Sequence, residues 1–283
     1  MGGLGNQLFQ IFATIAYAIE QNQPFRFPYS ETLKTGVERP TYWHSLFNNL
    51  LPYTATAALD LQAGFLRWQE PAFHYTKIPD PMTQNVVLYG YYQSPKYFET
   101  YQSDIYQMID IASKQQSIRA EFVRYLDAPY VISMHFRLGD YKHKQQYHPV
   151  LAKEYYQRAL NHILSRIRSG ENPVTPVRVL FFCEAEDNAY VQSVVDDLLA
   201  NSVSNVEFVK VDDTIEDWKQ MLLMSCCDSQ IIANSSFSWW GAYFCTNPDR
   251  IVCYPSTWFG PAMTNTNVED LFPDTWTQIR QIA

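Results

Sequence analysis

The 283-residue sequence is short of glycine, of paired cysteines and of long apolar runs. It has 10 glycines and five cysteines without a C-x-x-C pair, which excludes a full disulfide framework and indicates no zinc site. Cys226 and Cys227 are adjacent and the other three lie in apolar runs, so we expect buried, reduced thiols. No run approaches the roughly 20 residues of a membrane span, and Met1–Gln7 lacks the features of a secretory signal. We therefore expect a soluble, cytoplasmic protein without a transmembrane segment; peripheral membrane association is left open.

Basic residues are also in deficit, with 21 Lys and Arg against 29 Asp and Glu and a net charge of -8. This balance argues against a nucleic-acid partner, which would require a basic surface. A hydrophobic fraction of 47% indicates a folded chain, long enough for one large domain or two ordinary ones. Aromatic residues reach 16%, and although aromatic faces suit sugars, we expect most of these rings in the core.

Residues 1–128 are rich in proline and tyrosine, and their periodicity is irregular. Apolar residues from Leu8 to Ile19 have helical spacing and stop before Pro24, which predicts one helix after a glycine-rich opening. Residues 25–80 are interrupted by prolines, so we expect mostly loop and short elements there. A strand is expected over Val86–Tyr92 and a helix over Asp104–Leu126.

From residue 129 onward, short apolar strands alternate with helices. The expected strands are Val131–His135, Val177–Cys183, Val206–Lys210, Gln230–Ala233 and Ile251–Tyr254. The expected helices are Lys153–Arg168, Asp187–Leu199, Thr214–Cys226 and Phe237–Cys245. This alternation predicts an α/β fold with a doubly wound parallel sheet, in which ligands bind at the carboxyl ends of the strands.

Two motifs directly follow strands of this sheet. Phe136–Tyr141 contains Arg137, and Asn234–Gly241 places small hydroxyl residues at the start of a helix. Free N–H groups and the helix dipole favour a phosphate there, and an arginine supplies a bidentate cation. Taken alone, Asn234–Ser236 is better explained by a helix cap, and Arg137 is equally explained by a surface ion pair. Their expected position on one edge of the sheet favours an anion site.

A third motif, Gly2–Gln7, is a glycine-rich turn leading into the first helix. It is neither a G-x-G-x-x-G fingerprint nor a P-loop, because its last position is Gln7 and no lysine follows. One interpretation is a tight turn and helix cap. The other is a close approach of backbone to ligand at Gly5, with the Asn6 amide bonding a phosphate or a sugar hydroxyl.

Together these segments resemble the α-1,2-fucosyltransferase family, glycosyltransferase family 11. The resemblance is carried in order by Gly2–Gln10, Gly90–Ser94 with Tyr97-Phe98, His135–Tyr141, Asn234–Gly241, Pro255 and Trp258-Phe259. It implies inverting, metal-independent transfer of L-fucose from GDP-β-L-fucose to the 2-hydroxyl of a galactose-terminated glycan, without a cofactor. It also implies a GT-B-like architecture, with an acceptor-side domain at 1–128 and a Rossmann-like, GDP-sugar-binding domain at 129–283.

The resemblance implies roles for the residues of these motifs. Arg137 would neutralise the β-phosphate as GDP leaves, a type of contact that is usually the largest electrostatic contribution to catalysis. His135 would contact guanine, although a buried histidine at a strand end is an equal interpretation. Asn6 would orient the donor. The diphosphate would be held, in place of a metal, by the start of the last motif, namely Asn234, Ser235, Ser236 and Phe237.

The carboxylates are harder to interpret. Asp140 is read more readily as a structural partner of Arg137 or of the turn than as a catalytic group. Residues 142–146, where related enzymes offer a glutamate as base, contain no carboxylate here, which leaves Asp140, His143 and His148 as candidates. The residue that reads the guanine edge is expected to be Glu184, with Glu186 as the alternative.

Two further expectations follow from departures and absences. The family usually has a strand before the glycine-rich turn, whereas this sequence starts at the turn, so either that first strand is missing or the chain is truncated. No D-x-D-type pair follows a strand of the nucleotide half. Asp196-Asp197 lies inside a helix pattern and Asp212-Asp213 leads into one, so we expect solvated or capping charges there and no metal. Transfer from another GDP-sugar and an inactive glycan-binding relative are the alternative functions. The sequence pattern predicts neither the acceptor nor the oligomeric state.

Overall fold

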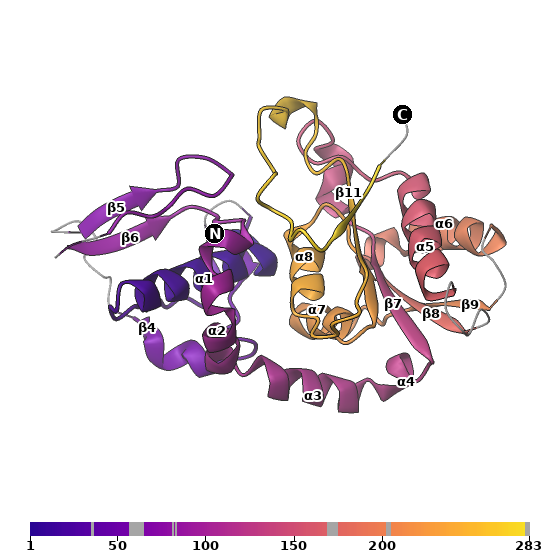
Figure 1. The fold of residues 1–283 in the computed structure, drawn as a ribbon, viewed down its shortest axis with the longest axis horizontal. Helices are drawn as coiled ribbons and strands as arrows, with labels where there is room; N and C mark the ends of the chain where they lie inside the picture. Colours follow the sequence, from indigo (N-terminus) through magenta and orange to yellow (C-terminus); the bar gives the residue numbers. More distant parts are fainter. Residues whose placement is uncertain are drawn as a thin grey trace. The chain divides into compact units, whose positions relative to one another are not determined.

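A computed structural model describes residues 1–34, 37–56, 65–80, 82, 84–168, 175–201 and 205–280. The chain divides into two compact units (Figure 1). The N-terminal unit comprises Met1–Ala112 and Asn265–Pro273, and the C-terminal unit comprises Ser113–Thr264 and Asp274–Ala283. The division lies before residue 128 because Gln115 is buried in the C-terminal unit, where its amide donates to the Ser225 hydroxyl at 2.8 Å and the Phe244 carbonyl at 2.9 Å.

The predicted first helix of the N-terminal unit is confirmed as α1, Leu4–Glu20. Its apolar stripe is buried, and Phe12 packs edge-on against Phe98 at a centroid distance of 5.3 Å. Short elements follow, in keeping with the frequent prolines. They are β1 (Phe27–Pro28) parallel to β4 (Thr54–Ala55), β2 (Thr32–Leu33) antiparallel to β3 (Arg39–Pro40), and the 3-10 helices Asn48–Tyr53, Pro95–Tyr97 and Glu99–Tyr101.

Two longer strands of this unit, β5 (Phe65–Gln69) and β6 (Asn85–Tyr89), pair in parallel. The strand predicted over Val86–Tyr92 corresponds to β6, which ends earlier because Gly90 begins a turn. β5 is one of the short elements expected between residues 25 and 80, although its apolar residues do not alternate strictly with polar ones. A cavity of about 750 Å³ is lined by residues of α1, β1 and β6.

The single helix expected over Asp104–Leu126 was wrong, since the chain forms three. These are α2 (Gln102–Ile109), α3 (Ile111–Glu121) and α4 (Val123–Leu126). Asp110 interrupts the first two with a left-handed φ of 59°. Aspartate is one of the few residues that tolerate this conformation at a helix end, but no glycine or proline marks the break in the sequence.

The C-terminal unit confirms the predicted doubly wound sheet. Six parallel strands lie in the order β12-β11-β10-β7-β8-β9. Their bounds are β7 Tyr130–His135, β8 Val177–Phe182, β9 Val206–Lys210, β10 Ser229–Ile231, β11 Val252–Pro255 and β12 Thr277–Ile279. Counted along the chain from β7, the spatial order is 3-2-1-4-5-6, the dinucleotide-binding order, whose reversal lies between β7 and β10.

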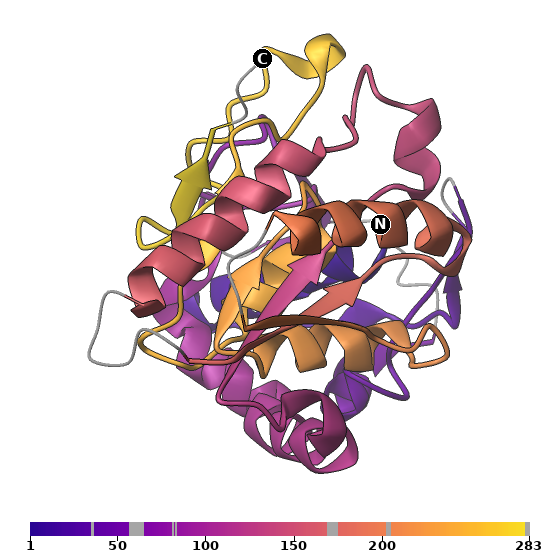
Figure 2. The ribbon, with the colours of Figure 1, turned by 90° about the vertical axis from the view of Figure 1, so that its right-hand side faces the viewer.

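Helices cover both faces of this sheet. Figure 1 shows α5 (Lys153–Arg168) and α6 (Asn188–Ala200) on one face, and α7 (Asp217–Ser225) and α8 (Ser236–Tyr243) on the other. In Figure 2, α5 and α6 lie in front of the strands. Under them, Met134 and Phe181 join one buried cluster with Tyr155 and Val191, while Trp239 on α8 is fully buried. The described residues of this unit also form three short 3-10 helices, Gly139–His143, Ala185–Asp187 and Pro261–Met263.

All five cysteines are buried and free, as expected from their apolar surroundings. Burial raises the pKa of Cys253 to about 12, so this thiol stays protonated. Within the part of the chain that the structure describes, no helix combines the length and apolar character needed to cross a bilayer.

Candidate functional site

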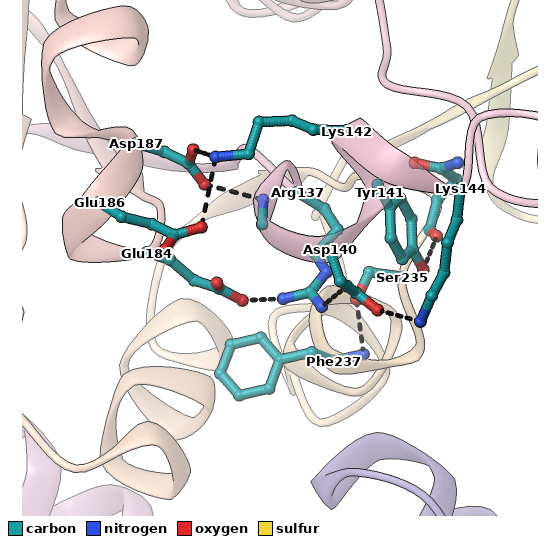
Figure 3. Close-up of polar contacts among 12 residues, drawn as sticks. Arg137, Asp140, Tyr141, Lys142, Lys144, Glu184, Glu186, Asp187, Ser235 and Phe237 are labelled. Atoms are coloured by element: carbon teal, nitrogen blue, oxygen red, sulfur yellow. Dashed lines mark hydrogen bonds and ion pairs between the residues drawn. The ribbon is translucent and has the colours of Figure 1, made fainter. Parts of the chain in front are cut away.

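The candidate site lies at the edge of the C-terminal sheet where the strand order reverses. β7 and β10 are parallel neighbours, with Met134 opposite Ile231, so the segments that follow them leave the sheet side by side. This confirms that the two motifs share one edge. Figure 3 shows the side chains of the segment after β7 beside those after β8 and at the start of α8.

Arg137 is the central cation of this edge. One guanidinium nitrogen donates to Glu184 and the other to Asp140 at 2.6 Å, and the group lies over the Tyr141 ring at 5.0 Å from its centroid. Burial lowers the pKa of the guanidinium, but Glu184, Tyr141 and Asp140 outweigh burial and raise it overall. The Arg137 guanidinium is therefore a permanent cation, and its plane is fixed by the two carboxylates that its nitrogens contact.

Glu184 reaches Arg137 because the backbone at Gly139 makes room for it. A Cβ at Gly139 would lie 2.5 Å from Glu184 Oε2, and Gly139 has a φ of +40°, where other residues are strained. Glu184 was predicted to read the guanine edge, whereas here its carboxylate is paired with Arg137. The two residues are 47 positions apart, and only the shared edge of β7 and β8 brings them together.

Lys142 forms a second cationic centre. Its ammonium contacts Glu186 at 3.2 Å and Asp187 at 2.7 Å, and the buried Asp187 also accepts from the Gly139 N–H at 2.8 Å. Glu184, Glu186 and Asp187 have ligand atoms within 4.8 Å of one another, so they are the described residues that could hold a metal. The sequence pattern did not predict this trio, because the Glu-x-Glu-Asp run is not a D-x-D-type pair. In the structure each of these three carboxylates is paired with Arg137 or Lys142.

The start of α8 is capped by Ser235, whose hydroxyl accepts from the Phe237 N–H at 3.3 Å. Ser236 opens the helix and is partly exposed. The Asn234 amide is turned away from this end, since it donates to the Pro149 carbonyl at 2.9 Å and to the Trp258 carbonyl at 3.2 Å. Asn234 therefore fixes the segments around the helix start, while Ser235, Ser236 and Phe237 present the helix end itself.

His135, the last residue of β7, is 8% exposed, and its ring lies 5.5 Å from that of Phe237. Burial, and secondarily the charge of Arg137, lowers the pKa of this imidazole to about 3, so it is neutral. Its buried Nδ1 has no hydrogen-bond partner among the described residues. Such a nitrogen is unusual in a folded protein and offers one unused hydrogen-bonding position beside Phe237.

Two of the three candidate bases, Asp140 and His148, lack the features of a strong proton acceptor. Burial raises the pKa of Asp140, but Lys144 at 2.9 Å and Arg137 outweigh it and lower the pKa overall, which makes the carboxylate a weak base. His148 stacks on Tyr141 at 4.8 Å, and burial lowers the pKa of its imidazole. His143 is exposed.

Asn6 and Gly5 lie in the N-terminal unit, in the first turn of α1. The Asn6 amide oxygen accepts from Gln93 Nε2 at 2.8 Å. Gly2 has a φ of +78°, and a Cβ there would lie 2.4 Å from Asn6 Nδ2. The glycine-rich turn thus brings backbone against the Asn6 amide, while Gly5 is buried within the helix.

Comparisons with known proteins agree with the resemblance seen in the sequence. Residues 58–280 match the family model described as Glycosyl transferase family 11. The chain is 24% identical to an alpha-1,2-colitosyltransferase of Escherichia coli, over 99% of this chain and 97% of that protein. It is 32% identical to the Escherichia coli O-antigen biosynthesis glycosyltransferase WbnK, over 51% of this chain and 43% of that protein.

Among solved structures, Arabidopsis thaliana FUT1, a mutant in complex with GDP, is similar with a TM-score of 0.50. It shares 9% identity, and the match covers 90% of this chain and 68% of that one, so the likeness concerns the fold alone. The fold is GT-B-like, with its parallel sheet in the C-terminal unit. With most of its length matched by the family model, the chain belongs to glycosyl transferase family 11 and is a glycosyltransferase.

Proposed function

We propose that the chain transfers L-fucose from GDP-β-L-fucose to the 2-hydroxyl of a galactoside, with inversion and without a metal. The observation that carries the proposal is the Arg137 fork beside the start of α8, where the order of the parallel strands reverses. A nucleoside diphosphate matches this edge, because its charge needs a bidentate cation and the dipole at the start of a helix favours an anion.

In this proposal Arg137 acts on the leaving group. The two carboxylates hold the guanidinium in place in the free protein, and the β-phosphate exchanges with one of them when the donor binds. As the glycosidic bond breaks, negative charge grows on the β-phosphate and strengthens its contact with the fork, so the interaction favours the transition state over the ground state. The Ser236 and Phe237 region at the start of α8 adds the helix dipole to the same effect.

His135 and Phe237 would form the wall for the guanine base. A neutral imidazole with an unused Nδ1 can bond a base edge, and the adjacent Phe237 ring offers an apolar face. This assignment follows the resemblance and is supported by the burial of His135, which keeps the ring neutral at physiological pH.

Metal independence is supported by the ion pairs of the acidic trio. Arg137 pairs with Glu184, and Lys142 pairs with Glu186 and Asp187, so each carboxylate that could bind a metal already has a cationic side chain as its partner. The inverting course and the α-1,2 linkage follow the family resemblance. The Escherichia coli relative whose sequence matches over 97% of its length is named as an alpha-1,2-transferase, and that name supports the linkage.

That same name favours a second candidate, transfer of colitose from its nucleotide-activated form. L-Colitose lacks the 3-hydroxyl of L-fucose, so the two donors differ by one hydrogen-bonding group. A site built to bond that hydroxyl rejects the deoxy sugar strongly, whereas an apolar pocket discriminates weakly.

The test is a transfer assay with GDP-L-fucose and GDP-L-colitose against a panel of β-galactosides, in EDTA, with the product linkage determined by NMR. We expect fucosylation of a galactose 2-hydroxyl. Faster transfer of colitose than of fucose would favour the second candidate function over fucosyl transfer. Binding of GDP, GMP and UDP is measured in parallel, and glycan binding without affinity for GDP would refute the proposal in favour of a non-catalytic glycan-binding protein.

A further inference from the structure

A tight turn, Gly90–Gln93, follows β6 in the N-terminal unit. β5 and β6 are parallel and end opposite each other, with Gln69 paired to Tyr89. Glu70 therefore emerges beside the turn, and its own N–H donates to the Tyr89 carbonyl at 2.9 Å. The carboxylate that directly follows one strand is thus held against the backbone that follows the other.

The carboxylate of Glu70 binds the backbone of this turn. It accepts from the Tyr91 N–H at 2.7 Å and, through both oxygens, from the Tyr92 N–H at 3.1 Å. Burial raises the pKa of Glu70, and the two N–H groups partly offset that effect. An ionised carboxylate is an acceptor through both oxygens and so fits two convergent donors, whereas an amide of the same shape would direct an NH₂ group at one of them.

The conformation of the turn depends on this contact. Tyr92 has a φ of 54°, a left-handed conformation that is unfavourable for an aromatic residue. At Gly90 a Cβ would lie 2.4 Å from the Glu70 Cβ, so only glycine lets the two strand ends come so close. The Tyr92 ring is 1% exposed and packs edge-on against Tyr97 at 5.1 Å, which anchors the turn from below.

The Gly90–Gln93 turn also positions the side chain of Gln93. Its amide nitrogen donates to Asn6 Oδ1 at 2.8 Å and so orients the Asn6 amide at the glycine-rich start of α1. A continuous series of contacts therefore runs from the Glu70 carboxylate, through two backbone N–H groups, to the side chain of Asn6.

We infer that Glu70 is a positioning residue for transfer, which orients Asn6 through the Gly90–Gln93 turn without touching substrate. The inference rests on the proposed function and on the role that the family resemblance implies for Asn6, which is to orient the donor. Loss of the carboxylate releases the left-handed turn, leaves Gln93 free to rotate and weakens its contact with the Asn6 amide.

The kinetic test is Glu70→Gln, with Glu38→Gln as the charge-matched control on an exposed glutamate of the same unit. We expect Glu70→Gln to lower kcat/KM for the donor about tenfold, a typical cost of losing hydrogen bonds to a charged group. Gln93→Ala, which leaves Glu70 and the turn in place, is expected to cost about the same. The double variant should be no worse than the more impaired single one, because both changes interrupt one series of contacts. Additive losses, or wild-type kinetics for Glu70→Gln, would overturn the inference.

An activity-independent measurement separates this inference from the proposed function. Amide hydrogen exchange at Tyr91 and Tyr92, and the NMR signals of the Asn6 side-chain amide, report the same contacts in a protein without substrate. We expect Glu70→Gln to speed exchange at both amides and to shift the Asn6 signals, while Glu38→Gln changes neither. If these signals respond but no sugar is transferred by the wild type, the proposed function fails alone. Unchanged Asn6 signals in Glu70→Gln refute the positioning role.

Discussion

Arg137→Lys keeps the positive charge of the residue and removes its fork. Arg137 uses separate nitrogens for Glu184 and Asp140, whereas a lysine ammonium is a point charge that cannot bridge both and still face a phosphate bidentately. Loss of one preorganised donor to a developing charge typically costs about 3 kcal/mol, which is on the order of a hundredfold in kcat. We expect that loss at saturating donor, with a larger one for Arg137→Ala.

The chain supplies a matched control at the opposite end of the sheet. Arg178, near the start of β8, pairs with Glu207 at 2.9 Å, and its side chain is 19% exposed compared with 20% for Arg137. Arg178→Lys therefore removes a similar fork from a similarly buried site that faces away from the candidate edge. We expect near-normal kcat for this variant.

The assay is steady-state transfer from GDP-fucose, with the Tm of each unliganded variant measured alongside. Glu184 and Asp140 are 49% and 39% exposed, so water can solvate them when the cation is lost, and we expect little change in Tm for Arg137→Lys. Wild-type kcat for Arg137→Ala at saturating donor would refute the reasoning. So would equal losses in Arg137→Lys and Arg178→Lys, since a general effect on the sheet would then explain both.

Three further outcomes are expected. His135 has a pKa of about 3 in the folded protein and about 6.5 when unfolded, so the unfolded state binds more protons between these values. The free energy of unfolding should therefore fall as pH falls through that range, by up to about 1.4 kcal/mol per pH unit. Urea titrations of His135→Gln should show a shallower fall than those of the exposed control His143→Gln. Gly139→Ala should lower the free energy of unfolding by about 1–2 kcal/mol because of its left-handed φ, and should also impair transfer by displacing Glu184; unchanged denaturation and kinetics would contradict this. Turnover should persist in EDTA, and loss that Mg²⁺ or Mn²⁺ restores would show that the acidic trio binds a required metal.

The parallel sheet could be predicted from the sequence because its strands are short apolar runs between amphipathic helices. α5 and β9 have the bounds that the pattern predicts, Lys153–Arg168 and Val206–Lys210. β12, Thr277–Ile279, was missed because a short polar run carries no strand signal of its own and pairs only through its neighbour β11. The N-terminal unit was predicted less well, because its short elements depend on tertiary contacts more than on periodicity.

The candidate site could be located from the sequence but its contacts could not. Two motifs after two strands sufficed to place Arg137 and Ser235 on one edge, since strand order follows simple rules. The pairing of Arg137 with Glu184 depends on the room left at Gly139, which is a matter of side-chain geometry. The Glu70 contact with the turn was likewise unpredictable, because it joins strand ends whose pairing was not foreseen.

The segment Asn265–Pro273 belongs to the N-terminal unit, although it comes near the end of the chain. Within it, Asp270 accepts from the Tyr75 N–H at 3.2 Å and pairs with Lys96, and its carbonyl accepts from the Ser94 hydroxyl at 2.7 Å. During synthesis on the ribosome, the N-terminal unit is therefore completed only after β11 of the C-terminal unit has been made. All strands of the C-terminal sheet except β12 emerge earlier, so the later half of the molecule can assemble its centre before the earlier half is complete.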